Sequence, residues 1–145
     1  MSTPKVHLAS DNGSPVHPLV LQAVIDANID HAPSYGADYW TEEAQKQIQE
    51  AFQVPCKIFF LPSGTGSNVL ALKIACRRYE SVLCTDIAHI AYQESGAAES
   101  IVGCKLLTIP HERGKLTPQA IIKKLHAEKA SGKHSTSPKV VSLTQ

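Results

Sequence analysis

Short apolar runs separated by helix-like segments, from residue 57 onward, constrain the fold of this chain more than any other feature. The runs are KIFFL (57–61), SVLCT (81–85), KLLTI (105–109) and KVVSL (139–143). Between them the sequence predicts helices at about 65–79, within 88–100 and at 117–129. Nearly all-apolar strands that alternate with helices are typical of a parallel sheet buried on both faces. We therefore expect an α/β fold with a three-layer, mostly parallel sheet covered by helices. We expect this fold to be truncated after the fourth recognisable strand.

Two more helices are expected before the first of these strands. One covers 17–30, where Pro18 lies in the first turn and apolar residues recur at helical spacing. The other begins after Thr41 as N-cap and ends near Gln53. The stretch HAPSYGADYW between them is expected to be an ordered loop, and SGKHSTSP (131–138) is the one linker-like run.

Composition excludes several classes of function. With 145 residues and 43% apolar content the chain can bury one core. A formal net charge of +1, with scattered lysines and arginines, gives no footprint for nucleic acid. The apolar runs are far shorter than the roughly 18 residues of a membrane-spanning helix, and the N-terminus has no secretory pattern. We therefore expect a cytoplasmic protein that binds neither nucleic acid nor membrane.

The cysteines and histidines do not predict a metal site. Cys56, Cys76, Cys84 and Cys104 form no C-x-x-C pair, and we interpret them as buried thiols. The seven histidines form neither H-x-x-x-H nor H-E-x-x-H.

The turn LPSGTGSN (61–68) is the strongest candidate for a binding site. It lacks the lysine of a Walker loop. The amides of Gly64, Thr65 and Gly66 at a helix N-terminus could hold a phosphate, with the hydroxyls of Ser63, Thr65 and Ser67 as further donors. The alternative is a hydroxyl-capped helix start with glycines for chain reversal, and spacing alone favours that alternative.

The same turn also permits a dinucleotide-binding interpretation. GTGSNV follows an expected strand, and Asp86 closes the next strand, near where a ribose-binding acid would lie. However, Val69 stands where the third glycine of that fingerprint permits close packing of helix on strand.

Four segments taken in order resemble the threonine aldolase family, the pyridoxal-phosphate lyases of fold type I. They are LASDNGSPVHP (8–18), HAPSYGADYWTEEA (31–44), SGTGSNVLALK (63–73) and TDIAHIAYQESGAAE (85–99), and GKLTP (114–118) follows them. The low-specificity branch, which includes enzymes for phenylserine-like substrates, is the most similar. The resemblance implies an N-terminal helical segment with an active-site loop at 1–56. It also implies the first, incomplete part of the pyridoxal-phosphate-binding large domain at 57–145.

The resemblance implies a cofactor site in the second of these regions. Gly64, Thr65 and Gly66 match the loop that binds the phosphate of pyridoxal 5'-phosphate. His89 matches the histidine that stacks on the pyridine ring and helps to move the proton of the substrate's β-hydroxyl group. Glu94 lies where an acid is common five residues after that histidine, and we assign it no role from the sequence. From the residues alone, His89 could instead be a strand-end histidine bonded to a backbone carbonyl.

Substrate-binding residues are implied in the N-terminal region. Ser10 matches a serine near the substrate carboxylate, and Tyr35 with Gly36 matches a loop that approaches the active site, often from a neighbouring subunit. His31 lies in a matching segment and is retained as a pocket residue. Ser10 with the following Asp-Asn-Gly could equally be a plain turn, and Tyr35 could be a packing or interface aromatic.

The implied reaction cleaves L-threonine or a related β-hydroxy-α-amino acid to glycine and an aldehyde, in a homo-oligomeric enzyme. The family's Schiff-base lysine, pyridine-nitrogen acid and carboxylate-binding arginine come later than the last strand of this sequence, so we expect the 145 residues alone to be inactive. The alternatives are a dinucleotide-binding module and a non-catalytic remnant of the aldolase fold.

Overall fold

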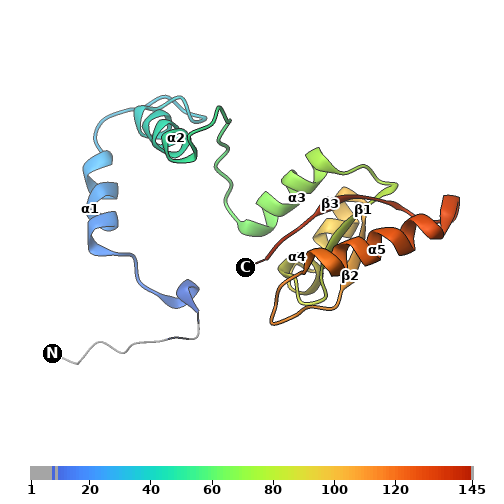
Figure 1. Cartoon of the computed structure of the whole chain (residues 1–145). Helices are drawn as coiled ribbons and strands as arrows, with labels where there is room; N and C mark the ends of the chain where they lie inside the picture. The colour runs from blue at the N-terminus through green and yellow to red at the C-terminus, as the bar shows by residue number, and fades with distance from the viewer. Residues whose placement is uncertain (1–7, 9, 145) are drawn as a thin grey trace. The chain divides into compact units, whose positions relative to one another are not determined.

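The structure is a computed structural model that describes residue 8 and residues 10–144. The chain divides into two compact units, Met1–Phe59 and Phe60–Gln145 (Figure 1). Within the described residues, no helix combines the length and the apolar content that crossing a bilayer requires.

In its described residues the first unit contains a short 3-10 turn and two helices. These are η1 (Asp11–Gly13), α1 (Pro18–Ala27) and α2 (Tyr39–Phe52). Helix α1 begins as expected with Pro18 in its first turn, and the ring nitrogen Nδ1 of His17 accepts a hydrogen bond from the amide of Leu19. It is shorter than the expected 17–30, since the chain leaves helical geometry at Asn28.

The N-cap of α2 differs from the expected one. Asp38, not Thr41, caps the helix: its Oδ1 accepts from the amide of Thr41 at 2.9 Å and its Oδ2 from the Thr41 hydroxyl at 2.7 Å. These bonds, that from the Thr41 side chain first, lower the pKa of Asp38. The prediction was wrong because both residues are good caps, and only the backbone geometry selects between them.

The second unit is built on a parallel sheet of three strands, which confirms the α/β fold class. The strands are β1 (Glu80–Thr85), β2 (Lys105–Ile109) and β3 (Ser137–Val141), in the order β2-β1-β3. Both neighbours run parallel to β1. The register pairs Leu83 with Leu107, so the apolar residues of the two strands share a face.

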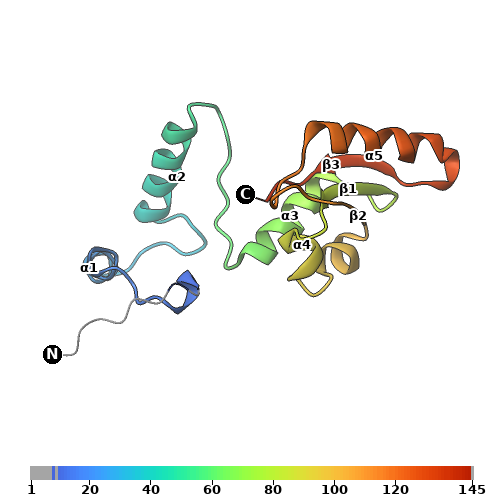
Figure 2. The same cartoon turned by 60° about the horizontal axis from the view of Figure 1, so that its bottom comes forward.

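Helices cover both faces of this sheet. Val82 and Cys84 of β1 pack with α3 (Gly64–Ala75), α4 (His89–Tyr92) and the short π-helical segment η2 (Ala98–Val102). Leu83 points to the other face and packs under α5 (Pro118–Ala130). Figure 2 shows α5 along one side of the strands and α3 along the other. The alternation follows from the two-residue period of a strand.

The expected strand at 57–61 is wrong. These residues are not in the sheet, and Phe59 and Phe60 are 70% and 55% exposed. A strand exists only where a neighbour pairs with its backbone groups, and among the described residues none pairs with this run. The linker-like reading of 131–138 is also partly wrong, because the segment forms η3 (Gly132–His134) and the start of β3.

The interpretation of the cysteines as buried thiols is confirmed for Cys76, Cys84 and Cys104, which are buried and free, whereas Cys56 is only partly buried. Burial raises the pKa of Cys76 and of Cys84 to about 11, and it raises the pKa of Cys104 as well.

Candidate active site

A cavity lies at the carboxyl ends of the strands, where open parallel sheets bind their ligands. It measures about 510 Å³ and is lined by Asp86, Ile87, His89, Tyr92, Gln93 and Thr144. Asp86 follows the last residue of β1 directly, and Thr144 comes shortly after the end of β3. The sheet topology therefore brings His89 to the edge at which chemistry is expected.

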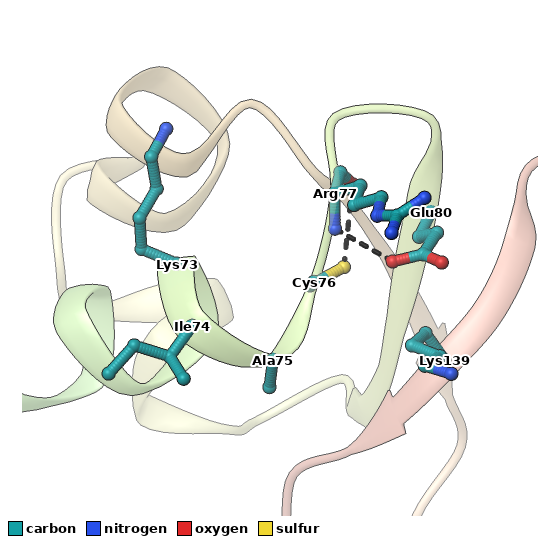
Figure 3. A pocket seen from close by; sticks show the side chains of 7 residues that line it. All are labelled: Lys73, Ile74, Ala75, Cys76, Arg77, Glu80 and Lys139. Atoms are coloured by element: carbon teal, nitrogen blue, oxygen red, sulfur yellow. Dashed lines mark hydrogen bonds between the residues drawn. The ribbon is translucent and has the colours of Figure 1, made fainter.

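A second cavity lies at the opposite end of the strands. It measures about 550 Å³ and is lined by Lys73, Ile74, Ala75, Cys76, Arg77, Glu80 and Lys139 (Figure 3). Glu80 is the first residue of β1, and its carboxylate accepts a hydrogen bond from the backbone amide of Arg77 at 2.7 Å. This carboxylate thus fixes the turn between α3 and β1. Because the cavity lies at the amino ends of the strands, we do not assign the active site to it.

The glycine turn forms the first turn of α3. Ser63 is the N-cap, and its Oγ accepts from the amide of Gly66 at 3.1 Å, while the Ser67 hydroxyl donates to the Ser63 carbonyl at 3.0 Å. The capped helix start is thus formed. Within the described part of the chain, the amides of Gly64 and Thr65 have no hydrogen-bond acceptor. A Cβ atom at Gly64 would meet nothing within 4 Å, so open space lies beside this residue.

A buried carboxylate links α3 to His89. Oε1 of Glu94 lies 2.6 Å from Nδ2 of Asn68 and 2.6 Å from Nδ1 of His89. The side chain of Glu94 is fully buried, whereas that of His89 is 51% exposed. Asn68 lies one turn after Gly64 on α3. The predicted phosphate turn and the predicted ring-facing histidine are therefore joined through two hydrogen bonds.

His111 is a further residue of this edge that was not predicted from the sequence. Its Nδ1 lies 3.0 Å from Oδ1 of Asp86, and both side chains are partly exposed. His111 comes shortly after β2 as Asp86 comes after β1. Both residues follow the end of an expected strand, and this could have predicted the pair, because the carboxyl ends of neighbouring parallel strands lie together.

The predicted substrate residues belong to the first unit and are all exposed. Oγ of Ser10 accepts from the amide of Asn12 at 3.2 Å, which closes a turn. Nδ1 of His31 lies 3.0 Å from Oδ1 of Asp30, and bonding to His31 lowers the pKa of that aspartate. Tyr35 and Gly36 both have positive φ, 62° and 78°. Such conformations are uncommon for a tyrosine, and the side chain of Tyr35 is exposed.

Comparison with known proteins decides the family. The model of the beta-eliminating lyase family matches residues 7–145. The chain belongs to the beta-eliminating lyase family. This family member is 40% identical over 146 residues to the low specificity L-threonine aldolase of Pseudomonas sp. (strain NCIMB 10558), across 100% of this chain and 42% of the relative. It is 41% identical over 138 residues to the same-named protein of Pseudomonas aeruginosa, across 94% of this chain and 39% of the relative.

A solved structure extends the comparison to the fold. The threonine aldolase of Leishmania major matches with a TM-score of 0.82 and 32% identity, across 89% of this chain and 37% of that chain. The resemblance to the threonine aldolases is thus confirmed, and this member of the beta-eliminating lyases spans about two-fifths of the length of its curated relatives.

Proposed function

We propose that the chain is the N-terminal portion of a pyridoxal-phosphate-dependent aldehyde-lyase that cleaves L-threonine or related β-hydroxy-α-amino acids to glycine and an aldehyde. The observation that carries this proposal is the link from Asn68 through Glu94 to His89, which ties an imidazole to the helix that begins with the glycine turn. The names of the relatives, low specificity L-threonine aldolases, supply the reaction class.

The residues at the start of α3 fit the phosphate of the cofactor. The free amides of Gly64 and Thr65 lie at the positive end of the helix dipole. The hydroxyl of Thr65 can add a donor, whereas the amide of Gly66 is already bonded to Ser63. In this proposal the phosphate binds chiefly to the first two amides. When bound, pyridoxal phosphate supplies the electron sink that makes cleavage of the Cα–Cβ bond feasible.

His89 fits a role in proton transfer. One ring nitrogen is bonded to Glu94, and the half-exposed ring lines the cavity at the carboxyl ends of the strands. The other nitrogen is then available to accept the proton of a β-hydroxyl group. Ser10, Tyr35 and His31 are proposed as substrate-binding residues, with Tyr35 and Gly36 acting in a homo-oligomer. Besides the cofactor, the proposed small-molecule partner is the amino-acid substrate.

The 145 residues alone are proposed to lack lyase activity, because no lysine in them matches the family's Schiff-base lysine. The free buried thiols fit a reducing compartment such as the cytoplasm, which we propose as the location.

A chimera tests the function of this segment. The matching segment of the Pseudomonas relative would be replaced by this chain, which aligns over its whole length. We expect the chimera to release glycine and aldehyde from L-threonine, and His89→Ala to lower kcat by about 10²-fold or more. As a matched control, His126→Ala on α5 should leave the rate unchanged. A folded chimera that binds pyridoxal phosphate but shows no lyase activity would contradict the proposal.

Ligand titration of the chain itself separates the alternatives. Pyridoxal phosphate, inorganic phosphate and NAD would be compared by intrinsic fluorescence. We expect pyridoxal phosphate to bind most tightly. A preference for NAD would favour the dinucleotide interpretation, although that motif requires a strand before its glycines and residues 57–61 form none. Binding of phosphate without preference would favour the non-catalytic remnant.

A further inference from the structure

The side chain of Glu94 occupies a position that packing alone does not explain. It is 0% exposed, and its Oε1 contacts the polar side chains of Asn68 on α3 and His89 on α4. Its second oxygen, Oε2, is buried and has no hydrogen-bond partner among the described residues. A buried oxygen without a partner is unfavourable. A carboxylate at this point of the fold therefore lowers the stability of the chain through the desolvation of Oε2. This cost suggests a role for Glu94 toward its two partners.

Hydrogen-bond chemistry sets the proton position once Glu94 is taken as ionised. Nδ2 of Asn68 is a donor, so Oε1 of Glu94 accepts from it. An ionised carboxylate only accepts, and with Glu94 in this form the 2.6 Å contact with Nδ1 of His89 is an N–H donated by the imidazole. In a neutral imidazole the remaining nitrogen, Nε2, then carries the lone pair.

We infer that Glu94 is a positioning residue: it holds His89 in the tautomer with the proton on Nδ1, so that Nε2 is the nitrogen that accepts a proton at the carboxyl edge of the sheet. This inference rests on the proposed function for the proton that Nε2 would accept. The buried carboxylate and the half-exposed imidazole support the direction of the arrangement, because the end bonded to Glu94 is inside and the ring lines the cavity.

Asn68 has a separate part in the arrangement. Its amide donates to the same oxygen and so fixes the carboxylate relative to α3. Removing Asn68 should loosen Glu94 without removing the acceptor for Nδ1. The two partners can therefore be distinguished by substitution.

Histidine tautomers can be read directly by long-range ¹H–¹⁵N NMR of the ring nitrogens in the whole 145-residue chain. In the unsubstituted chain we expect a protonated Nδ1 and an unprotonated Nε2 for His89. Glu94→Leu, which fills the buried space without an acceptor, should abolish this single tautomer, and Glu94→Asp should restore it in part. Asn68→Ala and the exposed-site control Glu99→Leu should both retain it.

Retention of the Nδ1–H tautomer in Glu94→Leu would overturn the inference, as would an Nε2–H tautomer in the unsubstituted chain. The backbone amide signals of β1 report whether each variant is folded. Should Glu94→Leu fail to fold, Glu94→Ala replaces it with the same expected loss of the tautomer.

The same variants in the Pseudomonas chimera give a second reading. Glu94→Leu should lower kcat by about tenfold or more with a smaller effect on KM, and Glu94→Asp should recover part of the loss. An inactive chimera, with no pyridoxal-phosphate binding, would overturn the proposed function while the NMR result still decides the tautomer.

Discussion

Nδ1 of His111 lies 3.0 Å from Oδ1 of Asp86, which links the segment after β2 to the segment after β1. The backbone amide of Asp86 also donates to the carbonyl of Ile109, the last residue of β2. The carboxyl edge of the sheet is therefore held by a backbone hydrogen bond and a side-chain pair, next to the cavity that Asp86 and His89 line.

Removal of His111 should have little effect on stability. Both side chains of the pair are partly exposed, 35% and 47%, and exposed ion pairs contribute at most about 1 kcal/mol. We expect His111→Ala to lower the free energy of unfolding by less than about 1 kcal/mol in urea denaturation. A loss of several kcal/mol would show that the pair is required for the fold.

Truncation of Leu83 should be severe. Leu83 lies on β1, the central strand, and its side chain is fully buried beneath α5. Leu83→Ala should cost about 2–5 kcal/mol of unfolding free energy, because it leaves a cavity. Ile74→Ala, at a residue of α3 that is 78% exposed, is the control and should cost about 0.5 kcal/mol or less. Thermal unfolding by circular dichroism would measure both.

Any side chain at Gly103 should lower the stability of the chain. Its φ is +81°, and an added Cβ would lie 3.2 Å from Cγ of Arg78. We expect Gly103→Ala to destabilise the chain by about 1–2 kcal/mol, because alanine is strained at positive φ. Gly13, where an added Cβ would meet nothing within 4 Å and φ lies outside the left-handed region, is the matched control. Equal effects of the two substitutions would contradict the prediction.

Thiol reactivity should separate Cys56 from the other cysteines. Burial raises the pKa of Cys76 and of Cys84 to about 11. A raised pKa keeps these thiols protonated at about pH 8, and the reactive thiolate forms only as the pH approaches 11. Iodoacetamide should therefore label Cys56 first, as mass spectrometry of tryptic peptides would show. In denaturing urea all four cysteines should be labelled at one rate. The same result without urea would contradict the burial of Cys76, Cys84 and Cys104.

Two helix caps should differ in their effect on the binding of pyridoxal phosphate. Ser63 caps α3, and Thr117 caps α5 through Oγ1, which accepts from the amide of Ala120 at 3.3 Å. Replacement of either by alanine should cost about 1 kcal/mol of stability. Only Ser63→Ala should weaken the binding of pyridoxal phosphate, because only α3 begins with the proposed phosphate turn. A titration of the two variants side by side measures the difference.

Local signals in the sequence account for most of the second unit. The strand at 105–109 and the helix start at Thr117-Pro118 are confirmed with their expected positions, because apolar runs and cap residues act over a few neighbours. The run at 57–61 failed because its pairing depends on a neighbouring strand rather than on its own composition.

The candidate site was only partly visible in the sequence. The glycine turn and His89 could be proposed from motifs. The contact of Glu94 with Asn68 could not, because it joins residues 26 positions apart through the packing of α3 with the segment that holds α4 and η2. The same holds for Asp86 and His111, 25 positions apart. Side-chain pairs that only the tertiary fold creates leave no periodic pattern in the sequence.

The central place of β1 has a consequence for how the second unit is made. One of its edges pairs with β2, which follows soon after it, but the other pairs with β3, at Ser137–Val141. During synthesis one edge of β1 therefore stays unpaired until the ribosome has released most of this sequence, including β3. For that interval its unpaired backbone groups are open to pairing with another extended chain.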